Sequence, residues 1–171
     1  MTSGLIHILD ADVFIQASRL YYSFDIAPAF WDVLVELADN GQICSIDRVK
    51  YELERGNDDL KEWAKSVFNI WFESTIQDDV IGCYREVMSW VNSRDQFLDK
   101  AKRDFANGAD GWLVAYAKAG RCVVVTQEQF KPGIKNKVPI PNVCQAFKVP
   151  CIDTFTMLRI MGVKLIGFEI A

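Results

Sequence analysis

The segment Leu5-Ile6-His7-Ile8-Leu9-Asp10-Ala11-Asp12 gives the clearest indication of the fold. Its first five residues form a short and almost continuous apolar run, which is typical of a strand buried on both faces of a parallel sheet. Two acids follow this run directly. Because ligands bind beyond the carboxyl ends of the strands in open parallel sheets, Asp10 and Asp12 are candidate functional residues.

The rest of the chain alternates between helical and strand patterns. Further strands are predicted at 42–46, 121–126 and 163–169. Helices are predicted over 28–41, 47–56 with Asp47 as its N-cap, 60–72, 79–91, 95–106, 110–120, 142–147 and 154–161. This alternation predicts an α/β fold with a mainly parallel sheet. A length of 171 residues favours a single domain, 1–171.

Composition excludes several classes of function. With 19 basic and 23 acidic residues the net charge is −4, so a general basic coat for duplex DNA is excluded. His7 is the one histidine, which excludes a His-rich zinc site or a histidine pair, and we expect it to be a hydrogen-bonded core residue. The five cysteines form no C-x-x-C pair and are expected to be reduced, as in a cytoplasmic protein. The first residues lack the basic-then-apolar layout of a signal peptide and no apolar run approaches the length of a membrane span, so we expect neither a secretory leader nor a membrane segment.

Carboxylates collect around the predicted strand ends. After the first strand come two acids, and others lie on the helix after the second strand, at the start of the helix before the third, and after the third: Asp10, Asp12, Glu52, Glu54, Asp110 and Glu128, with Thr126 beside the last. Acids gathered in one cleft repel each other and raise each other's pKa values. A divalent cation relieves this conflict, and oxygen ligands without His or Cys suit Mg²⁺ or Mn²⁺. Such a site can activate water for attack on a phosphate.

Four segments carry a resemblance to a known family. They are Leu9-Asp10-Ala11-Asp12-Val13-Phe14-Ile15, Ser45-Ile46-Asp47-Arg48-Val49-Lys50-Tyr51-Glu52-Leu53, Ala109-Asp110-Gly111-Trp112-Leu113-Val114-Ala115-Tyr116-Ala117 and Val124-Val125-Thr126-Gln127-Glu128. In this order they resemble the PIN domain, a family of metal-dependent nucleases that includes toxin ribonucleases of bacterial toxin–antitoxin pairs. The aromatic stretch Tyr21-Tyr22-Ser23-Phe24-Asp25 is similar to that of an uncharacterised PIN-like subgroup. The resemblance implies a three-layer α/β/α fold.

The resemblance also implies roles for individual residues. Asp10, Glu52 and Asp110 match the acids that bind Mg²⁺ or Mn²⁺ and serve catalysis in the family. Glu128 stands where the family usually has Asp, one methylene shorter, and Thr126 often accompanies that position. Asp12 stands at a position where the family commonly has Asn or Ser. Asp12 is either a further metal ligand or the cap of the following turn.

The implied activity is hydrolysis of phosphodiester bonds in single-stranded RNA, leaving 5′-phosphate and 3′-hydroxyl ends. The implied partners are an RNA substrate and a small antitoxin protein, with a homodimer as a further expectation and no membrane. Positive charges for the RNA backbone are available between 129 and 152, a stretch without acids, where the candidates are Lys131, Lys135 and Lys137. Arg19 beside Tyr21 and Tyr22 is a further candidate for clamping a single strand.

Each candidate also has an ordinary structural interpretation. Asp10 and Asp110 both stand where helix caps occur, and Glu54 competes with Glu52 as the acid that faces inward. Glu128 is alternatively a surface residue, and the loop lysines are alternatively solvated.

Two other functions remain open at this point. Asp10-Ala11-Asp12 also fits the D-x-D motif of haloacid-dehalogenase-type phosphohydrolases, with Asp10 as nucleophile and Asp12 as general acid–base. That family has Thr or Val two residues after the second Asp, where this chain has Phe14. The third hypothesis is a non-catalytic PIN-like module that binds RNA or protein, consistent with the replacement of Asp by Glu128.

Overall fold

A five-stranded parallel sheet forms the centre of the molecule. The computed structural model describes residues 4–170. Its strands run in the order β3-β2-β1-β4-β5, and every neighbouring pair is parallel. They are β1 (His7–Leu9), β2 (Ile43–Ile46), β3 (Phe72–Glu73), β4 (Val123–Val125) and β5 (Cys151–Ile152). The prediction of a mainly parallel central sheet is confirmed.

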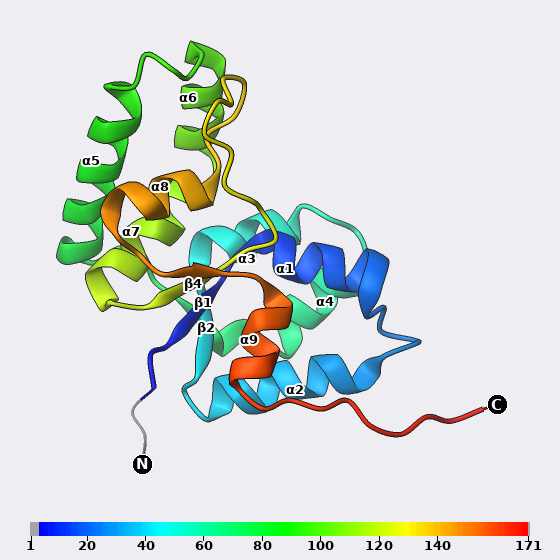
Figure 1. Ribbon diagram of the computed structural model, residues 1–171. Helices are drawn as coiled ribbons and strands as arrows, with labels where there is room; N and C mark the ends of the chain where they lie inside the picture. The colour runs from blue at the N-terminus through cyan, green and yellow to red at the C-terminus, as the bar shows by residue number, and fades with distance from the viewer. Residues whose placement is uncertain (1–3, 171) are drawn as a thin grey trace.

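Helices cover both faces of this sheet. They are α1 (Ala11–Gln16), the π-helix η1 (Ala17–Tyr21), α2 (Pro28–Asp39), α3 (Asp47–Glu54), α4 (Asp59–Ser66), the 3₁₀ turn η2 (Asn69–Trp71), α5 (Asp78–Asn92), α6 (Asp99–Asn107), α7 (Asp110–Gly120), α8 (Ile140–Phe147) and α9 (Thr154–Ile160). Figure 1 shows α5, α7 and α8 to one side of the strands and α1, α2, α4 and α9 to the other. The fold is therefore a three-layer α/β/α arrangement.

The first strand lies at the centre of the sheet, between β2 and β4. Ile8 and Leu9 are completely buried, as the continuous apolar run predicts for a strand covered on both faces. Ile8 lies level with Cys44 on β2 and with Val124 on β4. Because all strands are parallel, the residues that follow Leu9 and Val125 emerge at the same edge of the sheet.

Aromatic rings fill the core beneath α1. Phe14 is fully buried, and its ring centroid lies 5.9 Å from Trp63, 5.6 Å from Phe68 and 6.3 Å from Phe72. Trp31 joins this cluster through a T-shaped contact with Trp63 at 4.8 Å. The prediction that the tryptophans serve packing is confirmed, since the other three also pack against the core: Trp71, Trp90 and Trp112.

Both edge strands differ from the prediction. The strand predicted at 163–169 is wrong, because this segment has no strand pairing and leaves Phe168 89% exposed. The edge beside β4 is formed instead by Cys151 and Ile152, which lie level with Val124 and Val125. Strands of two residues, such as β3 and β5, are too short to produce an alternating pattern. Their position is fixed by the neighbouring strand rather than by their own sequence.

Two local predictions are also wrong. The carboxylate of Asp47 does not cap α3; it accepts hydrogen bonds from the Thr75 hydroxyl at 2.8 Å and the Thr75 backbone N–H at 3.2 Å. His7 lies in the core as expected, but its Nδ1 atom is buried without a hydrogen-bond partner among residues 4–170. Burial lowers the pKa of His7, which keeps the ring neutral at pH 7.

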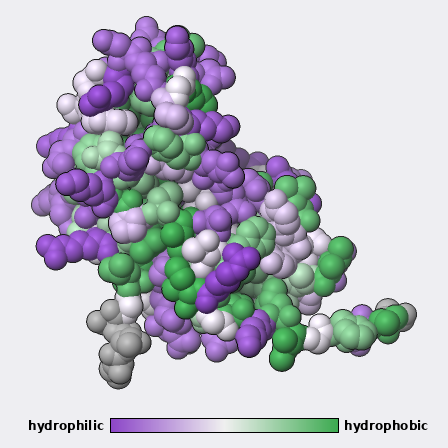
Figure 2. Space-filling model, viewed as in Figure 1, coloured by the Kyte–Doolittle hydropathy of each residue, from purple (hydrophilic) through white to green (hydrophobic). Residues whose placement is uncertain are grey.

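The remaining helices follow their patterns with shifted ends. The helix predicted over 60–72 ends at Ser66, where η2 follows after a short turn, and the one predicted over 95–106 begins at Asp99. All five cysteines are free. Among the described helices, none combines the length and apolar composition that a bilayer crossing requires. Figure 2 shows a hydrophilic surface over α5 and α6 and a more hydrophobic surface around α9 and the C-terminal segment.

Truncation of the central aromatic ring tests this packing. Phe14→Ala should lower the free energy of unfolding by about 3–5 kcal/mol, because the lost ring leaves a cavity between Trp63, Phe68 and Phe72. Thermal unfolding followed by circular dichroism measures the effect. In a chain of this size, each kcal/mol should lower the melting temperature by about 2–4 °C. Phe168→Ala, at an exposed ring, is the matched control and should change the melting temperature little. Equal losses in the two variants would contradict this account of the core.

Candidate functional site

The carboxyl edge of the two central strands holds a buried carboxylate. Asp10 follows β1 directly and is only 4% exposed. Its backbone N–H donates to the carbonyl oxygen of Val125 at 3.0 Å, which fixes it beside the end of β4. Its carboxylate accepts from the Ala11 N–H at 2.7 Å and caps α1. The capping interpretation therefore holds, and it uses only one of the two carboxylate oxygens.

The Thr126 hydroxyl connects two acids at this edge. Its Oγ1 atom lies 2.9 Å from Asp10 Oδ2 and 3.2 Å from Asp12 Oδ2. A hydroxyl has one proton, so it donates to one carboxylate at a time. Both oxygens of Asp12 also accept from the backbone N–H of Gln127 at 3.1 Å. Asp12 thereby anchors the start of α1 to the segment that follows β4.

A second pair of acids comes from α3 and α7. Glu52 Oε1 accepts from the backbone N–H of Ala109 at 3.0 Å, directly before α7 begins. Asp110 is the first residue of α7 and makes no capping hydrogen bond, so the simple N-cap interpretation of Asp110 is wrong. Glu54 pairs instead with Lys50, at 3.7 Å along the same helix. Of the two glutamates, Glu52 is therefore the one that faces Asp110.

Glu128 is held by the loop that follows it. Its Oε2 atom accepts from the backbone N–H of Ile140 at 2.9 Å, which ties it to the start of α8. Its Oε1 atom is paired with the ammonium group of Lys137. The side chain is only 15% exposed, so the interpretation of Glu128 as a surface residue is wrong. The loop from 129 to 139 is thus anchored at the acidic edge.

The acids act on one another across these elements. Burial raises the pKa of Asp110 to about 7, and the negative charges of Glu128 and Glu52 add to this effect. Burial also raises the pKa of Asp10 well above its usual range. The negative charges of Asp12 and Asp110 raise it further. The predicted acids from β1, α3, α7 and the end of β4 therefore form one electrostatic cluster. We call it the acidic cluster: Asp10, Asp12, Glu52, Asp110 and Glu128.

Lys137 supplies positive charge to this cluster. Burial opposes its charged form, but the pKa of Lys137 is raised because Glu128, Asp110 and Asp10 outweigh that cost. In turn, Lys137 lowers the pKa of Asp110, although by less than burial and the neighbouring acids raise it. One half-exposed ammonium group thus balances only part of the negative charge.

The donor chemistry of the cluster suits a hard divalent cation. All its side chains offer carboxylate oxygens, the ligands that Mg²⁺ and Mn²⁺ prefer. Within residues 4–170, however, no three His, Cys, Asp or Glu side chains are already arranged to hold a metal ion. Hydrogen bonds from Ala109 and Ile140 and the ion pair with Lys137 hold Glu52 and Glu128 in their present positions. Metal binding would therefore require some of these side chains to reorient.

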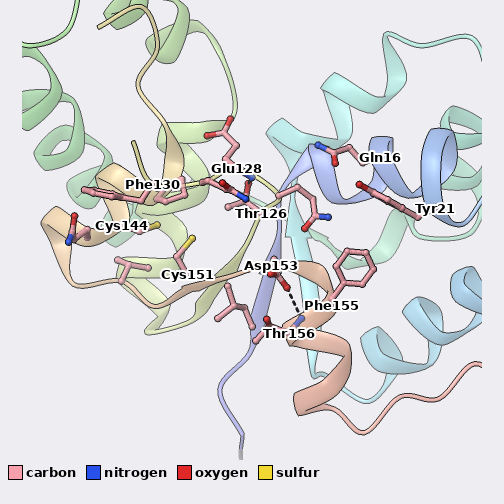
Figure 3. A pocket seen from close by; sticks show the side chains of 16 residues that line it. Gln16, Tyr21, Thr126, Glu128, Phe130, Cys144, Cys151, Asp153, Phe155 and Thr156 are labelled. Carbon is pink, nitrogen blue, oxygen red and sulfur yellow. Dashed lines mark hydrogen bonds between the residues drawn. The ribbon is translucent and has the colours of Figure 1, made fainter. Parts of the chain in front are cut away.

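The remaining candidates lie outside the cluster. Arg19, Lys131 and Lys135 are exposed, while Tyr21 lines a cavity that begins at Thr126 and Glu128. Figure 3 shows this cavity, with Phe130 on one side and Tyr21 and Phe155 on the other. Sequence reasoning named Tyr21 but missed the two phenylalanines. The distance of Phe130 and Phe155 from the acid motifs along the chain gave no sign that they share a cavity.

The raised pKa of Asp110 predicts a specific dependence of stability on pH. Between its ordinary value of 3.8 and about 7, the unfolded chain releases this proton while the folded chain keeps it. Stability of the metal-free protein should therefore fall as pH rises through this window. Asp110→Asn should make the fall in melting temperature from pH 5 to pH 8 smaller, measured in EDTA. Asp25→Asn, at an exposed acid, is the control, and an unchanged fall in Asp110→Asn would refute the prediction.

Removal of Lys137 should make the stability of the protein fall more steeply as pH rises. Lys137→Met takes away a positive charge that the ionised acids need at pH 8 but need less at pH 5. We expect a loss of up to about 1 kcal/mol at pH 8, because the ammonium group is half exposed, and a smaller loss at pH 5. Chemical denaturation at both pH values measures it, with the exposed Lys135→Met as control. Equal losses at the two pH values would show that Lys137 contributes packing rather than charge.

Comparison with known proteins agrees with this fold. The crystal structure of FitAcB from Neisseria gonorrhoeae superposes with a TM-score of 0.53 and 17% identity, over 86% of this chain and 96% of that chain. The crystal structure of VapBC2 from Rickettsia felis, bound to a promoter DNA fragment, superposes with a TM-score of 0.52 and 13% identity, over 87% of this chain and 98% of that chain. Both share the PIN-like α/β fold.

Sequence comparison identifies the family. No curated protein matches the chain. A family model described as a domain of unknown function, DUF4411, matches residues 7–165, a range that includes all five acids of the cluster. The chain therefore belongs to the DUF4411 family.

Proposed function

We propose that this protein is a metal-dependent endoribonuclease that hydrolyses phosphodiester bonds of single-stranded RNA. The observation that carries the proposal is the acidic cluster, in which the buried carboxyl of Asp10 and the partly buried carboxyl of Asp110 lie at the carboxyl edge of the sheet and the charge of Asp110 helps to raise the pKa of Asp10. Buried acids with uncompensated charge are costly to maintain. Their presence at the usual ligand-binding edge favours a functional role over a structural one.

The residues of the cluster have different roles in this proposal. Asp10, Glu52, Asp110 and Glu128 would hold Mg²⁺ or Mn²⁺. The bound ion supplies Lewis acidity, which lowers the pKa of water and offsets the charge of a phosphodiester. Gln127 donates to both oxygens of Asp12, and the Thr126 hydroxyl donates to either Asp10 or Asp12. Asp12 would serve as a further ligand or as the anchor of this edge.

The charge of the surrounding loop supports a nucleic-acid substrate. The stretch from 129 to 152 contains four lysines and no acid, in a chain whose net charge is −4. Lys131 and Lys135 are exposed and lie in the loop from 129 to 139, which Lys137 ties to Glu128. A local cationic strip of this kind can contact the phosphates that flank a cleavage point. Arg19 remains a further candidate for such a contact.

The proposal extends to a toxin role with a small antitoxin as partner. Its support is the motif resemblance to toxin ribonucleases and the likeness in fold to FitAcB and VapBC2. A homodimer is part of the same expectation.

Cleavage of labelled single-stranded RNA tests the activity. We expect cutting with Mn²⁺, no cutting with EDTA, and a loss of at least about 100-fold in Asp10→Asn, because that change removes a carboxylate at the centre of the cluster. Products should carry 5′-phosphate and 3′-hydroxyl ends. Glu54→Gln, on the same helix as Glu52 but paired with Lys50, is the matched control and should retain activity.

Other outcomes of this assay separate the competing functions. Activity on a small phosphate monoester alone would favour the phosphohydrolase, with Asp10 as nucleophile. A folded, metal-loaded protein that cuts none of a varied set of RNAs would favour the non-catalytic binding module. The pairing of Glu128 with Lys137 is the observation that supports that module, because it occupies one of the acids that a catalytic ion would need.

Expression in a bacterial host tests the toxin role. The wild-type chain should arrest growth when it is induced, whereas Asp10→Asn should permit growth at an equal level of soluble protein. The readout is colony formation after induction, with Glu54→Gln as the active control. Arrest by both Asp10→Asn and the wild type would show that toxicity does not come from the acidic cluster.

A further inference from the structure

An open cavity of about 980 Å³ adjoins the acidic cluster. Glu128, a member of the cluster, and Thr126, whose hydroxyl contacts Asp10 and Asp12, both line the cavity, so the cavity begins where the acids end. Its volume lies at the upper end of the range for sites that bind small organic molecules, about 300–1,000 Å³. Figure 3 shows Thr126 and Glu128 between the two sides of the cavity. Whatever occupies the cavity therefore lies next to the proposed point of cleavage.

Aromatic side chains stand on opposite sides of this cavity. Tyr21, at the end of η1, makes a T-shaped contact with Phe155 on α9, with ring centroids 5.6 Å apart and planes at 79°. Phe130 lies on the other side and is 47% exposed. Tyr21 is similarly 50% exposed. Both rings thus present surface on which a planar group can stack.

The polar lining is neutral or negative. Four glutamines line the cavity, and the residues that line it include no lysine or arginine: Gln16, Gln127, Gln129 and Gln145. Gln127 is held in place because its amide oxygen accepts from the Thr154 N–H at 3.1 Å. The two acids of the lining are already engaged, since Asp153 caps α9 and Glu128 pairs with Lys137. Such a lining suits an uncharged group with hydrogen-bonding edges and disfavours a phosphate.

We propose that this cavity binds a nucleobase of single-stranded RNA, adjacent to the phosphodiester that the acidic cluster would cleave. The inference rests on the proposed function and adds a subsite to it. A nucleobase combines a planar face with amide-like donors and acceptors, which match the aromatic rings and the glutamines. Its ribose tethers it to a phosphate, and this explains why a neutral cavity is continuous with an acidic site. A docked protein segment would not require that continuity.

Binding without cleavage tests the subsite. The affinity of the protein for fluorescently labelled pentauridylate and pentaadenylate is measured by anisotropy in EDTA, where the proposed activity is silent. Phe130→Leu should weaken binding of at least one oligonucleotide about tenfold, because stacking on each base contributes about 1–3 kcal/mol. Phe130→Tyr keeps an aromatic face and should bind like the wild type. Phe168→Ala, at an exposed ring of the C-terminal segment, is the control and should leave affinity unchanged.

Photocrosslinking locates the bound base directly. RNA containing 4-thiouridine should crosslink to Phe130 or Tyr21, as identified by mass spectrometry of the digested protein. Absence of crosslinks at both rings, or equal affinities for the wild type, Phe130→Leu and Tyr21→Leu with all three proteins folded by circular dichroism, would overturn the proposal. The cavity would then be better assigned to a protein partner.

The two proposals fail in different ways. Base binding that depends on Phe130, without cleavage in Mn²⁺, would support the subsite and refute the nuclease. Cleavage that is lost in Asp10→Asn, with affinity insensitive to Phe130 and Tyr21, would support the nuclease and refute the subsite.

Discussion

Repulsion between buried carboxylates is the constraint around which this structure is arranged. Asp10 and Asp110 come from segments 100 residues apart in the chain, yet the charge of Asp110 helps to raise the pKa of Asp10, and the charge of Asp12 raises the pKa of both. The fold tolerates this because backbone N–H groups, the Thr126 hydroxyl and the Lys137 ammonium group each take up part of the charge. The cap of α1, the start of α7 and the loop before α8 are each attached to an acid of the cluster.

The same contacts that balance charge also join the elements. Asp12 links α1 to the segment after β4, Glu52 links α3 to the start of α7, and Glu128 links the end of β4 to α8. Loss of an acid would therefore remove a structural tie together with a potential ligand. Protein donors thus already contact several of the carboxylate oxygens. A cation would compete with these donors.

The neutral cavity complements the charged edge. Aromatic rings from η1, α9 and the loop after β4 line the cavity that adjoins Glu128. The acidic cluster and the cavity thus lie side by side. In the proposed function this suits a substrate in which charged phosphates alternate with aromatic bases. None of the lysines of the loop that begins at Gln129 lines the cavity. The candidates for phosphate contacts and the rings proposed for base contacts are therefore different residues.

The sequence by itself determined the central strands and most helices, because short apolar runs and helical periodicity are local signals, and its four motifs singled out the candidate acids. The apolar run ending at Leu9 and the run before Thr126 placed the candidate acids at one edge. Tertiary structure alone decided the edge strands, since β3 and β5 have two residues each and take their register from a neighbour. It alone also decided that Glu128 pairs with Lys137, that Asp47 bonds to Thr75, and that Tyr21, Phe130 and Phe155 share a cavity. These contacts join residues distant in the chain, and no local pattern encodes them.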